Sequence, residues 1–341
     1  MTLSPTVIVH KQNDPYTIRM INYDFSNINL VPKLCIVESR NECRTSTKIG
    51  NREFKLPIVP ANMECIINDD IAIMLAHQGY FYIHHRFSVN ALVFAKKMSN
   101  LNLPISISLG VNRDAYDTLL ELQNNKLMPD YVTIDIAHGH SIKMKNILQW
   151  IKSMPNPPFV IAGNVSTKEG TRDLEEWGAD AIKVGIGPGA ACTTYVATGF
   201  GSRGCQASII KLCADSIKNP KTLIVADGGI KEPGDIVKSL ALGAGLVMIG
   251  GMFSGLKDSP GNTVTGLDGH LYKEFWGSAS AFQSGKKNRI EGTKKLVLMK
   301  QSGFLEELSY LEECIQSAIS YGGGTTLDCL KTVEIILKSS A

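Results

Sequence analysis

The stretch "TLIVADGGIKEPGDIVKSLALGAGLVMIGG" (residues 222–251) decides the fold of this chain. Two short apolar runs, 222–228 and 245–251, enclose a helical pattern that Pro233 opens near its first turn and Gly243 closes. The runs are apolar throughout rather than alternating, which is typical of parallel strands buried on both faces. The stretch therefore predicts one strand–helix–strand unit.

The same unit recurs along the chain. The candidate strands span 57–61, 80–84, 105–110, 131–136, 159–163, 181–185, 222–228 and 245–251. Eight such strands alternating with helices predict an α/β fold, the (β/α)8 TIM barrel. A doubly wound sheet is the alternative, but eight regular units without a break in composition favour the barrel.

Capping residues mark several of the helices. Asn68 is a plausible N-cap, and Ser166 with Glu169 has the spacing of a capping box. A last helix is indicated by the apolar spacing of Leu305, Leu308, Leu311, Cys314, Ile315 and Ile319.

Two segments are too long for ordinary loops of a barrel. One follows the sixth strand, at about 186–204, and the other follows the eighth, at about 252–300. Loops of this length in a compact domain are usually functional or disordered, and active sites of barrels lie at the carboxyl ends of the strands. We therefore expect one catalytic domain over 1–341, with a catalytic loop and a flap.

Composition limits the classes of function. The chain has 341 residues, 44% hydrophobic and 20% charged, as in soluble proteins with a large core, and its net charge of +3 is too small to favour nucleic acid. No signal peptide or transmembrane run is evident. The eight cysteines are dispersed without a CxxC pair, which favours neither zinc nor a disulfide framework. A cytoplasmic protein that binds neither membrane nor nucleic acid is expected.

The catalytic loop carries the strongest candidate for chemistry. "GIGPGAACTT" (185–194) presents the thiol of Cys192 on a glycine-rich segment, where a nucleophile can move against a substrate. The carbonyls of Gly187, Gly189 and Cys192 also suit a monovalent cation such as potassium. A flexible loop without a cation explains those glycines equally well.

Paired glycines end the last two strands. Gly228 and Gly229 follow Asp227, and Gly250 and Gly251 follow the eighth strand. Exposed backbone N–H groups at these two loops commonly bind phosphate in barrels. Asp227 suits the hydroxyls of a ribose. Asp135, at the end of 131–136, is a second candidate carboxylate, whereas the histidines of the chain lack the close spacing of zinc ligands.

Five motifs together resemble one known family. They are "PIVPANM" (57–63), "GIGPGAACTT" (185–194), "VADGGI" (225–230), "GLVMIGGMFSG" (245–255) and "NRIEGTKK" (288–295). In this order, over about residues 15 to 335, they resemble the IMP dehydrogenase and GMP reductase family. The GPGxxCTT form and the flap look like the reductase branch. The dehydrogenase normally carries CBS domains, for which this chain has no room, and an Arg-Tyr pair in its flap.

The resemblance implies a reaction and an assembly. GMP would be deaminated to IMP with NADPH, releasing ammonia through a covalent thioimidate on Cys192, as in purine interconversion and salvage. Thr194 and Glu291 would handle the proton of the departing ammonia. The resemblance further implies a homotetramer.

The resemblance also assigns residues to the two ligands. On the GMP side it implies Asn62, Met63, Asp227, Gly228, Gly229, Gly250, Gly251, Ser278 and Ser280. On the NADPH side it implies Gly110, Asp135, Ala137 and Asn164. The chain departs from the family pattern at Glu64, at Tyr195 and at Arg289, the last bearing on recognition of the NADPH 2′-phosphate.

Two alternatives stay open at this stage. The first is an IMP dehydrogenase without CBS domains, which would share the nucleotide site and the nucleophile. The second is a purine-nucleotide-binding protein without catalysis. The presence of Cys192, Thr194 and Glu291 together favours an enzyme.

Overall fold

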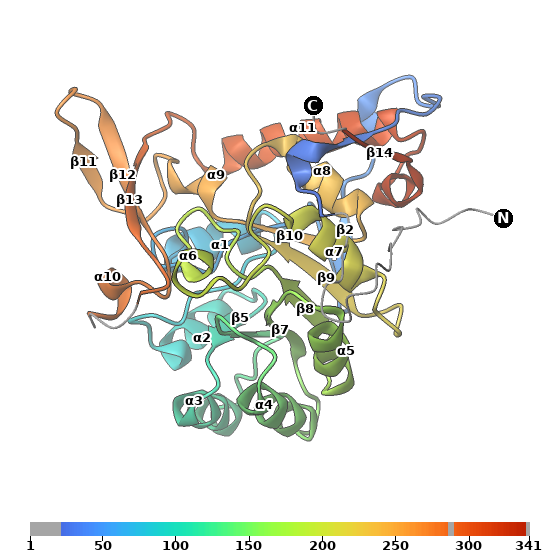
Figure 1. Ribbon diagram of the computed structural model, residues 1–341. Helices are drawn as coiled ribbons and strands as arrows, with labels where there is room; N and C mark the ends of the chain where they lie inside the picture. The colour runs from blue at the N-terminus through green and yellow to red at the C-terminus, as the bar shows by residue number, and fades with distance from the viewer. Residues whose placement is uncertain (1–21, 286–289, 339–341) are drawn as a thin grey trace.

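A computed structural model describes residues 22–285 and 290–338. Its centre is a parallel sheet of seven strands, in the spatial order β4–β10–β9–β8–β7–β6–β5, which curls into a half-barrel (Figure 1). The strands are β4 (Ile58–Pro60), β5 (Ser106–Leu109), β6 (Tyr131–Asp135), β7 (Phe159–Val165), β8 (Ala181–Val184), β9 (Leu223–Asp227) and β10 (Leu246–Ile249). Seven of the predicted runs are thus confirmed as strands, each to within two residues.

The run at 80–84 is confirmed only at its last residue. His84 forms a parallel bridge with Ile107 of β5. Its N–H donates to the Ser106 carbonyl at 3.1 Å, and its carbonyl accepts from the Ser108 N–H at 3.0 Å. The structure forms no ladder over 80–83, although Phe81 and its neighbours are buried in the core. Burial made this run look like a strand, but its backbone pairing is one residue long.

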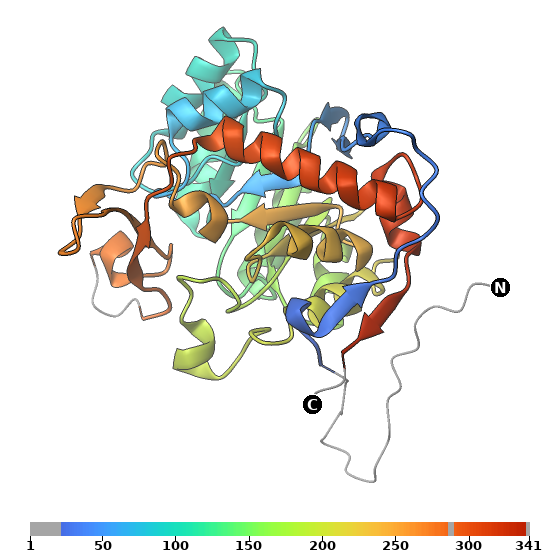
Figure 2. The same cartoon turned by 90° about the horizontal axis from the view of Figure 1, so that it is seen from above.

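Helices follow the strands and cover the outside of the sheet (Figure 1). They are α1 (Asp69–His77), α2 (Ala91–Asn100), α3 (Arg113–Asn124), α4 (Ile142–Lys152), α5 (Lys168–Glu176), α7 (Gln206–Ala214), α8 (Pro233–Ala241) and α11 (Phe304–Tyr321). The predicted last helix is confirmed as α11, which crosses the molecule beside α8 (Figure 2).

The N-terminal residues of three helices can be compared with the predicted ones. Asn68 caps α1 by accepting from the Ile71 N–H, and Pro233 is the first residue of α8. The capping box at Ser166 is wrong, because Thr167 caps α5 and accepts from the Gly170 N–H. Ser166 Oγ instead accepts from the Ile186 N–H at 3.0 Å. This serine therefore holds the start of the catalytic loop rather than the helix.

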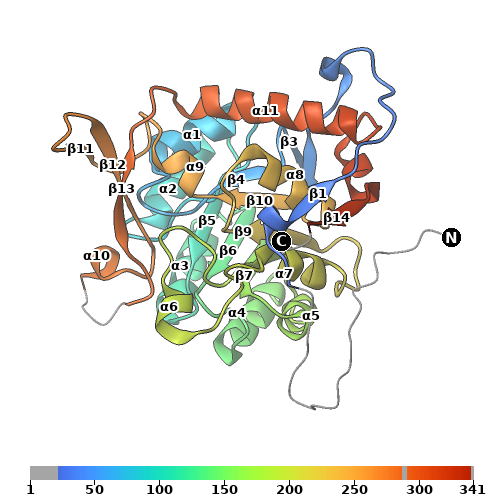
Figure 3. The same cartoon turned by 45° about the horizontal axis from the view of Figure 1, so that its top comes forward.

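Two irregular segments stand at the carboxyl end of the sheet (Figure 3). The catalytic loop after β8 contains α6 (Thr194–Thr198). The flap after β10 contains α9 (Gly251–Ser254), α10 (Ala281–Ser284) and a three-stranded antiparallel sheet of β11 (Thr263–Thr265), β12 (Leu271–Trp276) and β13 (Lys294–Leu298). The flap sheet and α10 lie to one side of the half-barrel, on the same side as α6.

Small elements complete the described chain. β1 (Ile28–Leu30) pairs antiparallel with β14 (Ile335–Leu337), so that the first and last described segments lie side by side (Figure 2). The hairpin of β2 (Thr47–Ile49) and β3 (Arg52–Phe54) brings Phe54 against Phe81 and Tyr131 inside the sheet. Short 3-10 helices are η1 (Phe25–Asn27), η2 (Arg40–Glu42) and η3 (Leu327–Thr332). Within the described ranges, every helix is too short or too polar to cross a membrane.

Candidate active site

The catalytic loop and the flap bring three predicted catalytic side chains together. The Cys192 thiol donates to Thr194 Oγ1 at 3.3 Å, and the Thr194 hydroxyl donates to Glu291 Oε2 at 2.7 Å. Glu291 lies 97 residues beyond Thr194 in the sequence, so only the folded chain brings them together. The three groups form a continuous hydrogen-bonded path from a thiol to a carboxylate.

Backbone pairing holds the loop against the flap. Cys192 and Gly292 form an antiparallel bridge, and the Thr193 N–H donates to the Glu291 carbonyl at 3.1 Å. On the other side, the Thr293 N–H donates to the Ala191 carbonyl at 2.9 Å. Gly292 is required by close packing, since a Cβ there would lie 2.9 Å from the Ser280 nitrogen. The position of Glu291 is thus set by the main chain on both sides.

A second polar cluster lies at the carboxyl ends of the parallel strands. Lys183 Nζ of β8 contacts Asp135 Oδ1 at 2.9 Å and Asp227 Oδ2 at 2.7 Å. Asn62 Nδ2 donates to Asp135 Oδ2 at 2.9 Å, and Asn164 Nδ2 donates to Asp227 Oδ2 at 2.7 Å. Four of these five residues were predicted to contact ligands, and the structure joins them through one lysine.

The cluster is charged although it is buried. Burial opposes the charge of Lys183, but the carboxylates of Asp135 and Asp227 outweigh it and raise the pKa of the lysine. Burial likewise opposes ionisation of Asp135, but Lys183 and the Asn62 amide lower the pKa of that carboxyl. Both groups are therefore ionised at neutral pH, and the lysine balances one of the two negative charges.

One buried acceptor in this cluster lacks a partner. Asn164 Oδ1 is enclosed and makes no hydrogen bond, although the amide nitrogen of the same side chain makes two. An unpaired buried oxygen is costly, so such an atom points to a donor that arrives with a ligand. A hydroxyl group supplies such a donor, which fits a ribose.

Of the two glycine turns predicted to bind phosphate, the one at 228–229 lies beside the catalytic loop. Gly228 and Gly229 have φ of +87° and +81°, which glycine adopts without strain. A Cβ on Gly228 would lie 3.0 Å from the Gly189 nitrogen, whereas a Cβ on Gly251 would meet nothing within 4 Å. The Gly251 position therefore faces open space, where an anion has room.

Comparison with known proteins identifies the family. The IMP dehydrogenase / GMP reductase domain matches residues 22–341. This chain belongs to that family.

Curated relatives of the family are similar over nearly the whole chain. The GMP reductase of Clostridium acetobutylicum is 49% identical over 320 residues, covering 93% of this chain and 96% of the relative. That of Mesoplasma florum is 46% identical, covering 94% and 99%. That of Bacillus licheniformis is 48% identical, covering 93% and 97%. The resemblance to the family inferred from the motifs is thereby confirmed.

The remaining residues that the family resemblance assigned are spread around these clusters. Met63 lies near Gly250, where a Cβ on the glycine would approach Met63 Sδ to 3.5 Å. Ser280 caps α10 by accepting from the Gln283 N–H, and Ser278 lies just before it. Ala137 is exposed in the loop after β6. Arg289 lies outside the described residues.

Gly110, which the family resemblance assigns to the cofactor, borders a cavity. The cavity has a volume of about 550 Å³ and is also lined by His84, His85 and Arg86. Arg86 stacks on Phe87. Burial raises the pKa of Asp135, Lys183 and Asn62 outweigh that effect and lower it, and the positive charge of Arg86 adds to the lowering. This cavity thus places a cation close to the predicted cofactor residues.

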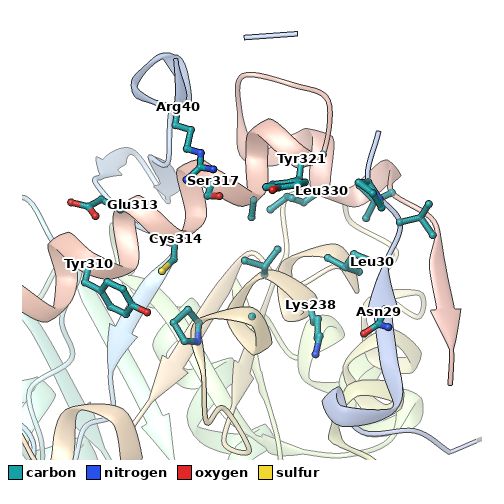
Figure 4. A pocket seen from close by; sticks show the side chains of 18 residues that line it. Asn29, Leu30, Arg40, Lys238, Tyr310, Glu313, Cys314, Ser317, Tyr321 and Leu330 are labelled. Atoms are coloured by element: carbon teal, nitrogen blue, oxygen red, sulfur yellow. The ribbon is translucent and has the colours of Figure 1, made fainter. Parts of the chain in front are cut away.

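A larger cavity of about 780 Å³ lies elsewhere, between α8, α11 and β1 (Figure 4). Its lining includes Leu30, Lys238, Tyr310, Cys314 and Tyr321. Cys192 and the other predicted site residues are absent from its walls. Size alone therefore does not mark the candidate active site of this family member.

Lys183 is the main residue that the sequence analysis missed. Lys183 lies in β8 ("AIKV"), a strand buried on both faces, and is only 3% exposed. A lysine flanked by apolar residues in such a strand must find carboxylates, because an unpaired buried charge is very costly. That rule, applied to the strand at 181–185, would have indicated it.

Proposed function

We propose that this protein catalyses the reductive deamination of GMP to IMP with NADPH, releasing ammonia. The observation that carries the proposal is the hydrogen-bonded path Cys192–Thr194–Glu291 at the mouth of the sheet. Relatives that are 46–49% identical over more than nine-tenths of the chain and are named GMP reductases support the same reaction.

In this proposal Cys192 is the nucleophile. Its sulfur forms a bond to C2 of the purine, and the C2–N bond breaks as the amino group leaves as ammonia. The covalent thioimidate that results divides a difficult substitution into two easier steps. NADPH supplies the hydride that releases IMP. When C2 receives this hydride, the C2–sulfur bond breaks and the thiol is restored.

Thr194 and Glu291 move the proton that the leaving amine needs. An amide ion is too basic to depart, so a proton must reach the nitrogen. The Cys192 thiol donates to the Thr194 hydroxyl, which donates to Glu291. The proton lost by the thiol therefore has a path to the carboxylate and back to the amine.

The two ligands would divide the polar cluster between them. Asp227 suits the ribose of GMP, and the turns at 228–229 and 250–251 suit its phosphate. Asn164, which the resemblance assigns to the NADPH side, donates to Asp227 and would offer its unpaired oxygen to a ribose hydroxyl of the cofactor. Asn62 and Met63 would line the purine, with Ser278 and Ser280 near the base and the nicotinamide. Asp135, Gly110 and Ala137 would face NADPH, whose ribose and phosphates the cavity beside Arg86 can receive.

Potassium is proposed at the carbonyls of Gly187, Gly189 and Cys192. The donor set suits a hard monovalent cation, because each carbonyl has a second lone pair, and Gly187 adopts φ of +84°. The Gly189 carbonyl already accepts from the Cys192 N–H at 3.0 Å, which keeps the two residues close.

A bound potassium ion would stiffen the loop that carries the thiol. We predict higher activity, or a higher melting temperature, in potassium than in lithium chloride at equal ionic strength. Equal values in the two salts, after removal of contaminating potassium, would contradict the site.

Finer features of the family stay predictions. They are a closed barrel of eight strands, a single catalytic domain without CBS domains, a homotetramer and a cytoplasmic location.

The proposed reaction has a direct test. Absorbance of NADPH is followed with GMP, and ammonia is assayed in the same samples. A GMP-dependent loss of NADPH with equal release of ammonia supports the proposal. Reduction of NAD that depends on IMP indicates the dehydrogenase instead, and nucleotide binding without turnover indicates a binding protein.

A further inference from the structure

Lys183 lies between two carboxylates that the proposed function gives to different ligands. Asp227 would contact the nucleotide, and Asp135 would contact the cofactor. The lysine side chain is 4% exposed, whereas the two aspartate side chains are about one-fifth exposed. The carboxylates thus reach the open side of the cluster, and the ammonium lies beneath them.

We propose that Lys183 is a positioning residue that holds both ligand-binding carboxylates at once, so that the nucleotide site and the cofactor site depend on one ammonium group. This inference rests on the proposed function. Lys183 acts through the carboxylates and does not itself react.

The register of the sheet provides a path for the lysine. Asp135 of β6, Gly163 of β7 and Lys183 of β8 are consecutive partners across three neighbouring strands. A Cβ on Gly163 would lie 2.5 Å from Lys183 Cβ. The missing side chain on β7 therefore leaves the space through which the lysine passes over one strand to reach Asp135.

Each carboxylate is fixed from two sides. Asp135 accepts from Lys183 with one oxygen and from Asn62 with the other. Asp227 accepts from Lys183 and Asn164 through the same oxygen, Oδ2. Its Oδ1 makes no hydrogen bond to any described residue, and the Asp227 side chain is 19% exposed.

Removing the ammonium would release both acids together. Two like charges in a shared, poorly solvated site repel each other, so one would take a proton or turn away. Since hydroxyl groups of both ligands would donate to these carboxylates, both affinities would fall. A residue that served a single ligand would lower only one affinity.

The test is calorimetric titration of GMP and, separately, of NADP⁺ into wild type and Lys183→Met. We expect both dissociation constants to rise about tenfold or more. Asp227→Asn should weaken mainly GMP, and Asp135→Asn mainly NADP⁺. An effect of Lys183→Met on one ligand alone, or on neither, overturns the inference.

Lys152→Met is the matched control. Lys152 Nζ contacts Asp180 Oδ2 at 2.5 Å, and Asp180 precedes the same strand β8 at its opposite end. This variant loses a lysine–aspartate pair that is more exposed than the pairs of Lys183 and that lies at the other end of the strand. It should keep both dissociation constants at the wild-type values, and a parallel rise there would overturn the specific role of Lys183.

A charge-keeping variant covers the case in which Lys183→Met does not fold. Lys183→Arg retains the positive charge, but its larger planar group displaces both carboxylates. Its two affinities should fall in parallel, and a fall in one alone overturns the inference. If wild type itself binds neither GMP nor NADP⁺, the proposed function fails instead.

Discussion

The reactivity of each cysteine thiol in this protein depends on the surroundings of its side chain. Burial raises the pKa of Cys65 to about 12 and that of Cys213 to about 11, which makes both inert as nucleophiles near neutral pH. Cys192 is half-buried on an irregular loop, and its thiol donates to Thr194. The chemistry of this thiol therefore comes from its position rather than from its residue type.

Replacing Cys192 by alanine tests that position. Cys192→Ala should abolish turnover of GMP, because no covalent intermediate can form, and should leave GMP binding close to that of wild type. Initial rates and calorimetry measure the two effects. Cys35→Ala, at an exposed thiol, is the control and should stay active. A Cys192→Ala enzyme that keeps about a tenth of wild-type activity would contradict covalent catalysis.

Glu291 allows the two half-reactions to be separated. Glu291→Gln should slow ammonia release from GMP about a hundredfold or more, the usual worth of acid–base help. Hydride transfer from IMP to NADP⁺ needs no such proton and should change little. Rapid-mixing measurements of ammonia and of NADPH absorbance compare the two steps.

The control for this carboxylate is another glutamate of the flap. Glu274 pairs with Lys294 at 2.5 Å, accepts from Asn262 Nδ2 at 3.0 Å and lies opposite Leu296 in the flap sheet. Glu274→Gln should leave both steps near wild type. Equal slowing of both steps by Glu291→Gln would remove its proposed role.

At the scale of elements, α10 is fastened to the turn after β4. Trp276 Nε1 donates to Gln283 Oε1 at 2.7 Å, and Gln283 Nε2 donates to Glu64 Oε2 at 2.7 Å. Glu64 follows Asn62 and Met63, which are predicted to line the purine. The contact therefore joins the nucleotide side of the sheet to the flap that carries Glu291.

Loss of this contact should affect catalysis more than stability. Glu64→Ala should lower kcat/KM for GMP about tenfold, since a hydrogen bond to a charged group contributes about 1.5–3 kcal/mol. The melting temperature should change little, because Glu64 is partly exposed. Steady-state kinetics and thermal unfolding measure the two quantities.

A side-chain amide on another helix provides the comparison. Gln316 of α11 donates to the Cys43 carbonyl at 3.4 Å, away from the flap. Gln316→Ala should keep wild-type kinetics. If Glu64→Ala behaves in the same way, the contact does not position the flap.

At the scale of the whole molecule, His85 links stability to pH. Burial, with the neighbouring His84, lowers the pKa of His85 to about 4, whereas an unfolded chain has a histidine pKa of about 6.5. Between these values only the unfolded chain binds the proton. Acid therefore favours unfolding, and the free energy of unfolding should fall by about 3 kcal/mol as pH drops from about 6.5 to 4.

Unfolding by urea across this range measures the effect. His85→Gln cannot titrate and should show a shallower dependence on pH. His77→Gln, at an exposed position at the end of α1, should keep the wild-type slope. A slope that His85→Gln leaves unchanged would show that another group is responsible.

The sequence by itself determined the order of strands and helices and the family. Apolar runs predict buried parallel strands because burial on both faces favours apolar side chains, and Asn68 and Pro233 start helices for reasons local to the backbone. The placement of Cys192 after β8 follows from the order of the strands alone.

Only the tertiary structure decided which distant groups meet. Ser166 lies one residue before the observed N-cap of α5, and its hydroxyl accepts a hydrogen bond from the Ile186 N–H instead. The run at 80–84 is buried but pairs with β5 only at His84. Lys183 reaches Asp135 only because Gly163 lies between them in the register. Thr194 meets Glu291 only because backbone bonds join loop to flap. Such contacts depend on strand register and loop approach, which local patterns of residues do not encode.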